Sequence, residues 1–132
     1  MQFMLDTNIC IYIIKNRPAS VKKRLATLSP PEVGISSLTL AELLYGVHKS
    51  GRPEKNREAL NNFAGLLELS PFDDRCAEAY GEISAHLESM GRVIGQMDML
   101  IAAHAKSLNV TLVSNNIREF KRIPGLKLEN WT

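Results

Sequence analysis

Phe3-Met4-Leu5-Asp6-Thr7-Asn8 is a short apolar run that ends in a carboxylate, and the apolar residues after it recur at helical spacing. This pattern predicts a buried strand over residues 2–5, followed directly by a helix over residues 6–15. In open α/β sheets, ligands bind at the carboxyl edge of the strands. The sequence therefore places the Asp6 carboxylate at the edge where a protein of this type has its functional site.

The rest of the chain alternates between strand-like and helix-like segments. Leu40, Leu43, Leu44 and Val47 show the spacing of one helix face. Further strands are predicted over residues 33–36, 69–72, 110–113 and 126–128, and further helices over residues 18–28, 40–49, 53–67, 74–90 and 96–108. Strands that alternate with helices of this length predict an α/β fold with a central, mostly parallel β-sheet flanked by helices on both faces.

Length and composition favour one compact domain. The chain has 132 residues, of which 45% are hydrophobic, and we expect a single domain over residues 1–132. The formal net charge of +2 is compatible with a nucleic-acid partner but does not establish one. No signal peptide is recognisable, and the longest apolar run is about a third of what a membrane span requires. We therefore expect a cytoplasmic protein without a membrane partner.

Cys10 and Cys76 lie far apart in apolar segments with helical periodicity. The two could pair, but the expected cytoplasmic location favours buried free thiols.

Three acidic residues stand where an expected helix begins, namely Asp6, Glu42 and Asp98. If they meet at one edge of the sheet, their mutual repulsion is unfavourable unless a divalent cation neutralises it. Clustered carboxylates that hold Mg²⁺ are typical of enzymes that act on phosphodiester bonds. We expect Asp6 and Asp98 to be direct metal ligands, and Glu42 to bind through water or to hold the attacking water.

Each of these acids also has a purely structural explanation. Asp6 is placed to be the N-cap of its helix, Thr39 and Glu42 match a capping box, and Asp98 suits the dipole of a first helical turn. Taken singly, these readings are as good as a metal site. Capping does not explain why the carboxylate at position 6 has such apolar neighbours. Burial of a charge without a partner of opposite charge is costly. Taken together, the three acids therefore favour a shared site.

Polar residues beyond the strand at 110–113 are expected at the same sheet edge. Ser114, Asn116 and Glu119 are candidates to complete the outer part of the site, whereas Asn115 is expected to be a turn residue. Thr7 and Asn8 are placed to donate hydrogen bonds to Asp6 or to a phosphate, although preferences at helix starts explain them equally well.

Four stretches in a fixed order carry a family resemblance over essentially the whole chain. They are FMLDTN (3–8), ISSLTLAELLYG (35–46), IGQMDMLIAAHA (94–105) and LVSNNIREF (112–120), and the ending over residues 123–131 continues the match. In these stretches the chain resembles the PIN-domain ribonucleases, and its ending is similar to the VapC toxins of bacterial toxin–antitoxin pairs.

The resemblance implies an endoribonuclease that depends on Mg²⁺ or Mn²⁺ and arrests translation and growth by cutting RNA, with tRNA the favoured substrate. It further implies a bacterial cytoplasmic protein that is neutralised by a VapB-type antitoxin. A homodimer and a hetero-oligomer with the antitoxin are also implied. The acidic positions of the family fall on Asp6, Glu42 and Asp98.

The chain departs from the family at the fourth acidic position, where it has Asn116. Either Glu119 supplies this carboxylate from the next turn, or the site uses three acids and a neutral oxygen ligand; we favour Glu119. Gln96 and Met97 also depart from the residues common before Asp98, which predicts an altered loop with the ligand retained.

The remaining predictions concern substrate and partner surfaces. Lys15, Arg17 and Arg118 are our candidates for contacts with RNA phosphates, although a solvated face is the default explanation of such charges. His104 is predicted to pack in the core rather than to act in catalysis. The amphipathic helices between residues 18 and 67 are candidates to bind the antitoxin, but core burial would explain the same pattern.

Two other classes of function compete with the ribonuclease. A phosphatase of the haloacid dehalogenase type also begins with a strand and an Asp, but it needs a second Asp at position 8, which is Asn8 here. A catalytically silent RNA-binding domain would keep the fold without turnover, and the departure at Asn116 is compatible with it.

Overall fold

A five-stranded sheet forms the centre of the computed structural model, which describes residues 1–132. The strands lie in the order β3-β2-β1-β4-β5, and every neighbouring pair is parallel. Their bounds are β1 (Phe3–Leu5), β2 (Val33–Ser36), β3 (Glu68–Ser70), β4 (Thr111–Val113) and β5 (Leu128–Glu129). The predicted α/β fold is thereby confirmed, with a sheet that is parallel throughout.

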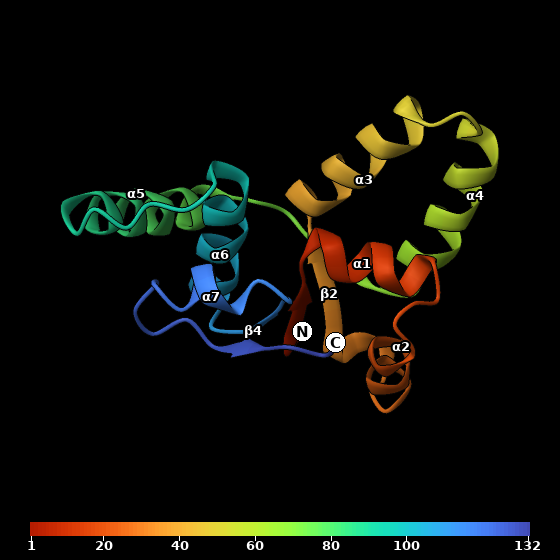
Figure 1. Cartoon of the computed structure of the whole chain (residues 1–132), viewed down its shortest axis with the longest axis horizontal. Coiled ribbons are helices and arrows are strands. Elements are labelled where there is room, and N and C mark those ends of the chain that lie inside the picture. The colour runs from red at the N-terminus through yellow and green to blue at the C-terminus, as the bar shows by residue number, and fades with distance from the viewer.

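Seven α-helices and one short 3-10 helix connect these strands. Their bounds are α1 (Thr7–Ile14), α2 (Ala19–Ala26), η1 (Pro30–Glu32), α3 (Ser37–Lys49), α4 (Pro53–Ala64), α5 (Asp74–Ser89), α6 (Gln96–Leu108) and α7 (Ile117–Phe120). Figure 1 shows α5 and α6 on one side of the central strands and α1, α3 and α4 on the other.

Alternation along the central strands divides the interior into two apolar cores. Phe3 and Leu5 of β1 point into one core, and Met4 between them points into the other. The first core contains residues of α1 to α4, and the second contains residues of α5, α6 and α7. A strand that is buried on both faces reads as a continuous apolar run, which is why β1 shows no polar alternation in the sequence.

Besides α3, which begins at Ser37 instead of residue 40, the predicted elements differ from the structure at four places. β3 lies at 68–70 instead of 69–72 because Pro71 has no amide to donate to the sheet. α4 ends at Ala64 instead of 67, and β5 covers only Leu128–Glu129 instead of 126–128. Helix α7 was not predicted, since four residues are too few for an apolar period to show.

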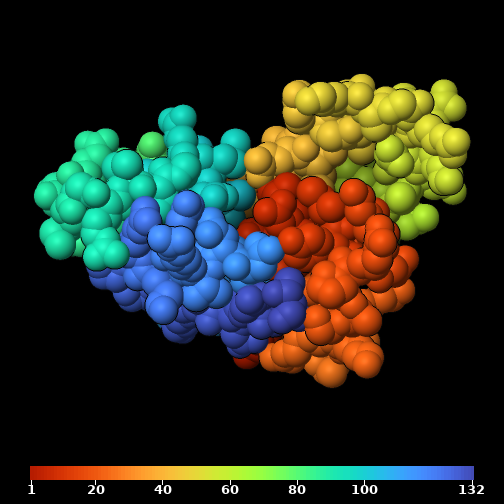
Figure 2. Space-filling model, viewed as in Figure 1, coloured from red at the N-terminus to blue at the C-terminus, as the bar shows by residue number.

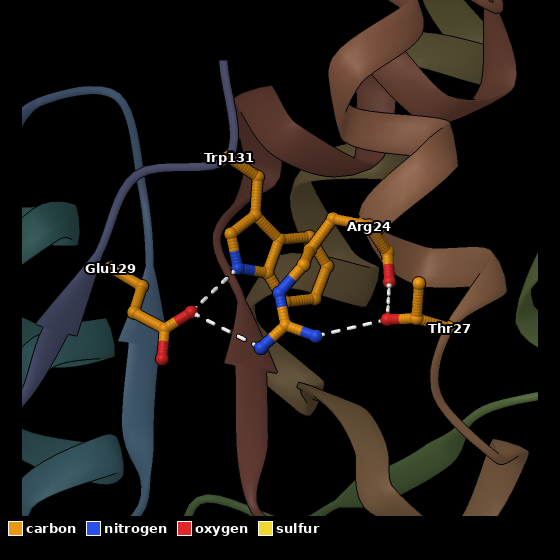
Figure 3. A network of polar contacts seen from close by, with 4 residues as sticks. All are labelled: Arg24, Thr27, Glu129 and Trp131. Atoms are coloured by element: carbon orange, nitrogen blue, oxygen red, sulfur yellow. Dashed lines mark hydrogen bonds and ion pairs between the residues drawn. The ribbon is translucent and has the colours of Figure 1, made fainter.

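The C-terminal segment packs against β1 and α2 through Trp131. The rings of Phe3 and Trp131 lie 5.7 Å apart, and the Arg24 guanidinium lies 5.4 Å and 5.5 Å from their centroids. Figure 3 shows the same guanidinium between Thr27, which accepts a hydrogen bond of 2.9 Å, and the Glu129 carboxylate at 3.6 Å. The Trp131 indole N–H also donates to Glu129. These contacts hold β5 and α2 against the central strand.

The two cysteines are buried in the interior of the protein. Cys10 and Cys76 are both buried and free, as predicted. No helix combines the length and the apolar character needed to cross a membrane.

Two glycines allow a matched test of the sheet packing. A Cβ on Gly34 of β2 would lie 2.7 Å from the backbone oxygen of Glu68 in β3, whereas a Cβ on Gly46 of α3 would meet nothing within 4 Å. We expect Gly34→Ala to lower the free energy of unfolding by about 1–3 kcal/mol. Gly46→Ala should raise it by about 0.5–1 kcal/mol, because alanine favours the helix. Urea unfolding measures both, and equal effects of the two changes would contradict this packing.

Candidate active site

The carboxyl ends of β1 and β4 bring Asp6 and Ser114 together. Leu5 pairs with Val113 in the sheet, and the Asp6 amide donates to the Val113 carbonyl at 3.0 Å. Asp6 is the N-cap of α1, as one reading of the sequence predicted, and its Oδ1 accepts from the Ile9 amide at 2.9 Å. The Ser114 hydroxyl hydrogen-bonds to the same carboxylate. These hydrogen bonds hold the Asp6 carboxylate in one orientation. The residue is only 5% exposed, so its carboxylate is largely shielded from water.

Helix α3 brings Glu42 to the same edge. The helix begins at Ser37, and the Ser36 hydroxyl caps it by accepting from the Leu38 amide at 3.0 Å. The capping box between Thr39 and Glu42 is therefore wrong, because both residues lie within the helix. Instead, the Thr7 hydroxyl donates to Glu42 Oε1. Thr7 thus orients Glu42 rather than Asp6.

Asp98 and Glu119 approach from α6 and α7 and share Asn116 as a hydrogen-bond partner. Asp98 lies in the first turn of α6 and is partly buried. The Asn116 side-chain nitrogen donates to Glu119 Oε2 at 3.1 Å, and its amide also hydrogen-bonds to Asp98. Because Asn116 turns its N–H groups toward the two acids, the arrangement favours Glu119 as the extra carboxylate and Asn116 as the residue that positions it.

Neighbouring acids act on the carboxylates of Asp6 and Asp98. Burial raises the pKa of Asp6 above its ordinary value, and the charges of Asp98 and Glu42 raise it further. Burial likewise raises the pKa of Asp98, together with the charges of Glu119 and Glu42. Figure 2 shows the start of α1, in red, between α3 in gold and the teal and blue surfaces of α6 and the segment around α7. The charges of Asp6, Glu42 and Asp98 therefore act on one another, and their meeting around one ion stays a prediction.

No basic side chain answers this negative charge. The ion pairs of the chain join the N-terminus to Glu68 and Arg24 to Glu129, and both lie outside the site. Two carboxylates with raised pKa values, near two further acids and without a cationic partner, are a donor set that suits a hard divalent cation such as Mg²⁺.

The spacing of the acids limits how such a cation would be held. As the side chains stand, no three acidic, histidine or cysteine residues are close enough to bind one ion together. Mg²⁺ takes only one or two carboxylates directly and keeps several waters. The donor set therefore fits an ion with two direct carboxylate ligands and water between the ion and the others. Direct ligation by Asp6 and Asp98 stays a prediction.

His104 lies in the core, as predicted, but it also has a polar role that the sequence analysis missed. Its Nδ1 lies 2.8 Å from the Ser36 hydroxyl and its Nε2 lies 3.0 Å from the Ser70 hydroxyl. Ser36 and Ser70 are register partners at the ends of β2 and β3. Burial lowers the pKa of His104, which favours a neutral ring. The ring thus links α6, which carries Asp98, to the strand end that caps α3. The serines that end β2 and β3, Ser36 and Ser70, were the sequence feature that could have indicated polar partners for this histidine.

The basic residues predicted to bind RNA lie in two separate hollows rather than among the acids. Lys15 and Arg17 line a hollow of about 580 Å³ together with Tyr12 and Asn115. Arg118 lines another, of about 520 Å³. Asn8 is exposed in the first turn of α1, beside Asp6 and Thr7.

Comparison with known proteins gives a consistent result over the full length. The family model described as "PIN domain" matches residues 3–126. The "Ribonuclease VapC2" of Rickettsia felis is 50% identical over 99% of this chain and 98% of the relative. The "tRNA(fMet)-specific endonuclease VapC" of Shigella flexneri is 45% identical over 100% and 99%. The "Crystal structure of DNA bound VapBC from Salmonella typhimurium" matches with a TM-score of 0.95 at 42% identity, covering 100% of this chain and 99% of the other.

The buried carboxylate of Asp6 predicts a characteristic dependence of stability on pH. Because its folded pKa is raised above its ordinary value of 3.8, ionisation costs stability as pH rises through this range, and the cost is fully present above the folded pKa. Asp6→Asn keeps an oxygen acceptor for the Ile9 amide and removes the charge. At pH 7, in the presence of a metal chelator, we expect Asp6→Asn to raise the free energy of unfolding by about 1 kcal/mol. The gain should be smaller near pH 4, because there the Asp6 carboxylate of the unchanged chain is partly protonated.

Denaturant unfolding at both pH values measures this gain. Asp74→Asn, at an exposed position of α5, is the matched control and should change stability by less than about 0.5 kcal/mol. A loss of stability at pH 7 in Asp6→Asn would show that the charge is already compensated within the protein.

Proposed function

The chain belongs to the PIN-domain family and, within it, to the VapC ribonucleases, and from this membership we propose that it is a metal-dependent endoribonuclease toxin of a toxin–antitoxin pair. It would act as a single domain over residues 1–132, hydrolyse phosphodiester bonds in RNA within the bacterial cytoplasm, and thereby arrest translation and growth. The observation that carries the proposal is the group of four carboxylates at one edge of the sheet without a protein cation.

Each carboxylate has a distinct proposed role. Asp6 and Asp98 would be the direct ligands of Mg²⁺ or Mn²⁺, Glu42 would bind through water or hold the attacking water, and Glu119 would supply the fourth carboxylate. When bound, the cation would make a coordinated water more acidic and offset the charge on the scissile phosphate. The hydrogen bonds from Thr7 to Glu42 and from Ser114 to Asp6 support these roles, because they fix the carboxylates before substrate binds.

Asn116 would keep Asp98 and Glu119 in place through its two amide hydrogens. This arrangement supports a role for Glu119 at the position where the family has another acid. The hydrogen bonds of Asn116 give it a positioning role, so its presence does not by itself imply a silent site.

We propose structured RNA as the substrate, with tRNA favoured. The Shigella relative is named as a tRNA(fMet)-specific endonuclease, and the net charge of this chain is mildly positive. Lys15, Arg17 and Arg118 would contact RNA phosphates from exposed positions, and Asn8 would donate to a phosphate near Asp6.

We also propose that a VapB-type antitoxin binds the apolar side of the chain. A hollow of about 450 Å³ lies between α1, α2 and α4, and its apolar lining includes Ile13, Leu25 and Phe63. Leu66 also lines this hollow and is 67% exposed, so it extends the apolar surface toward solvent. An amphipathic helix of the antitoxin fits such a surface. The VapBC complex from Salmonella supports an assembly of toxin with antitoxin. We further propose that the chain forms a homodimer and, with the antitoxin, a hetero-oligomer.

Family membership removes the support for a haloacid dehalogenase phosphatase, which also lacks its second acid because position 8 is Asn8. The remaining alternative is a catalytically silent RNA-binding domain, and the following experiment distinguishes it from a ribonuclease.

The proposal can be tested by inducing the chain without an antitoxin in bacteria and sequencing RNA ends shortly afterwards. We expect growth arrest with new ends concentrated in one class of RNA. Asp6→Ala and Asp98→Ala should restore growth, because loss of a charge-stabilising group lowers the cleavage rate by at least about a hundredfold.

Asp74→Ala, which removes an exposed acid on α5, is the matched control and should arrest growth like the unchanged chain. Arrest that persists in both Asp6→Ala and Asp98→Ala would refute the assigned roles. RNA that is bound but left intact in the presence of Mg²⁺ or Mn²⁺ would instead indicate a silent domain.

A further inference from the structure

A hollow of about 520 Å³ lies between α7 and the loop that follows α5. Five residues line it, and four of them are cationic: Arg92, Ile117, Arg118, Lys121 and Arg122. The segment between Gly91 and Gly95 brings Arg92 to α7, which is more than twenty residues further along the chain. The backbone supports this approach, because the Arg122 guanidinium donates to the Val93 carbonyl at 3.0 Å.

The cations that line this hollow form no ion pair within the protein. None of the four cations takes part in either ion pair of the chain. The chain has 16 basic and 14 acidic residues, so without these four cations it would carry more acids than bases. A quarter of its basic residues therefore line this one hollow. Four unpaired cations in one hollow repel one another, and a bound anion relieves this repulsion.

Helix α7 connects the hollow to the carboxylates. Glu119 lies between Arg118 and Lys121 in the sequence, and its carboxylate is bound by Asn116 beside Asp98. The flanking cations line the hollow instead. Helix α7 and the two residues after it thus present an acid, Glu119, to the proposed catalytic site and three bases to the neighbouring hollow. An extended polyanion that reaches the acids can therefore reach the hollow as well.

We propose that this hollow is a phosphate-binding subsite, which holds an RNA phosphate at some distance from the bond that is cut. The proposal rests on the ribonuclease function and assigns Arg92, Lys121 and Arg122 to substrate binding together with Arg118. Guanidinium groups suit this ligand because they bind phosphate oxygens in pairs. The hollow would bind the RNA backbone without reading its sequence, and it would fix the position of the substrate over the acids.

A double substitution that avoids Arg118 tests the subsite. Arg92→Gln with Lys121→Gln removes one cation from each side of the hollow. Lys23→Gln with Lys55→Gln removes the same charge from exposed positions of α2 and α4 and is the matched control. Binding of a short single-stranded RNA is measured in the Asp6→Asn background over a range of salt concentrations, so that cleavage does not interfere.

We expect the hollow variant to bind RNA roughly tenfold more weakly, because it loses two charge-assisted contacts. The slope of log K against log salt should become smaller by about 1.4, which corresponds to two phosphate contacts. With Asp6 restored, KM should rise while kcat stays unchanged, because the lost binding is shared by ground and transition states. The control pair should keep both the affinity and the slope close to those of the parent.

Three outcomes overturn the subsite. One is an equal effect of the two double variants, which would show a general effect of charge. Another is a fall in kcat with unchanged RNA binding. The third is that the hollow variant loses the binding of inorganic phosphate but binds RNA as well as the parent does. The hollow would then bind free phosphate only.

Failure of the ribonuclease function itself gives a different result. In that case the unchanged chain leaves RNA intact with Mg²⁺ or Mn²⁺, and the binding arm still decides whether the hollow holds RNA. If the hollow variant alone weakens RNA binding and flattens the salt dependence, the subsite is supported even without cleavage.

Discussion

Mutual repulsion among four carboxylates at one edge of a parallel sheet is the constraint on which the rest of the site depends. Asp6 follows the central strand β1, and the strand order brings the ends of β2 and β4 to either side of it. Thr7 donates a hydrogen bond to Glu42, Ser114 hydrogen-bonds to Asp6, and Asn116 donates to Glu119. The protein thus orients the negative charges but supplies no cation to neutralise them. Such an arrangement is costly for folding and useful for binding a divalent cation.

The stability that offsets this cost lies elsewhere in the fold. β1 is buried on both faces between two apolar cores, so the strand that leads into Asp6 is firmly packed. His104 links α6 to the ends of β2 and β3, and the contacts of Trp131 and Arg24 fasten the end of the chain. The acids are therefore mounted on rigid elements, which is what catalysis by positioned charge requires.

Local patterns in the sequence predicted most of the elements. They grouped Asp6, Glu42 and Asp98 because each acid stood at an expected helix start, although Glu42 lies within α3. They did not predict the strand order, which depends on pairings between distant segments. Nor did they predict that Thr7 would bind Glu42, 35 residues away. The helix start at Thr39 was misplaced, because Ser36 and Ser37 offered an equally good cap three residues earlier. The role of Asn116 depends on the direction in which its amide points, and only the coordinates show it.

The most direct test of this account is a calorimetric titration of the chain with Mn²⁺ at pH 7, beside Asp6→Asn and Asp98→Asn. The account predicts saturable binding by the unchanged chain, with a free energy of unfolding that rises with Mn²⁺ concentration as linkage requires. Binding should be strongly weakened in both variants. Absence of saturable binding, or equal binding by all three proteins, would contradict the claim that these carboxylates form a cation site.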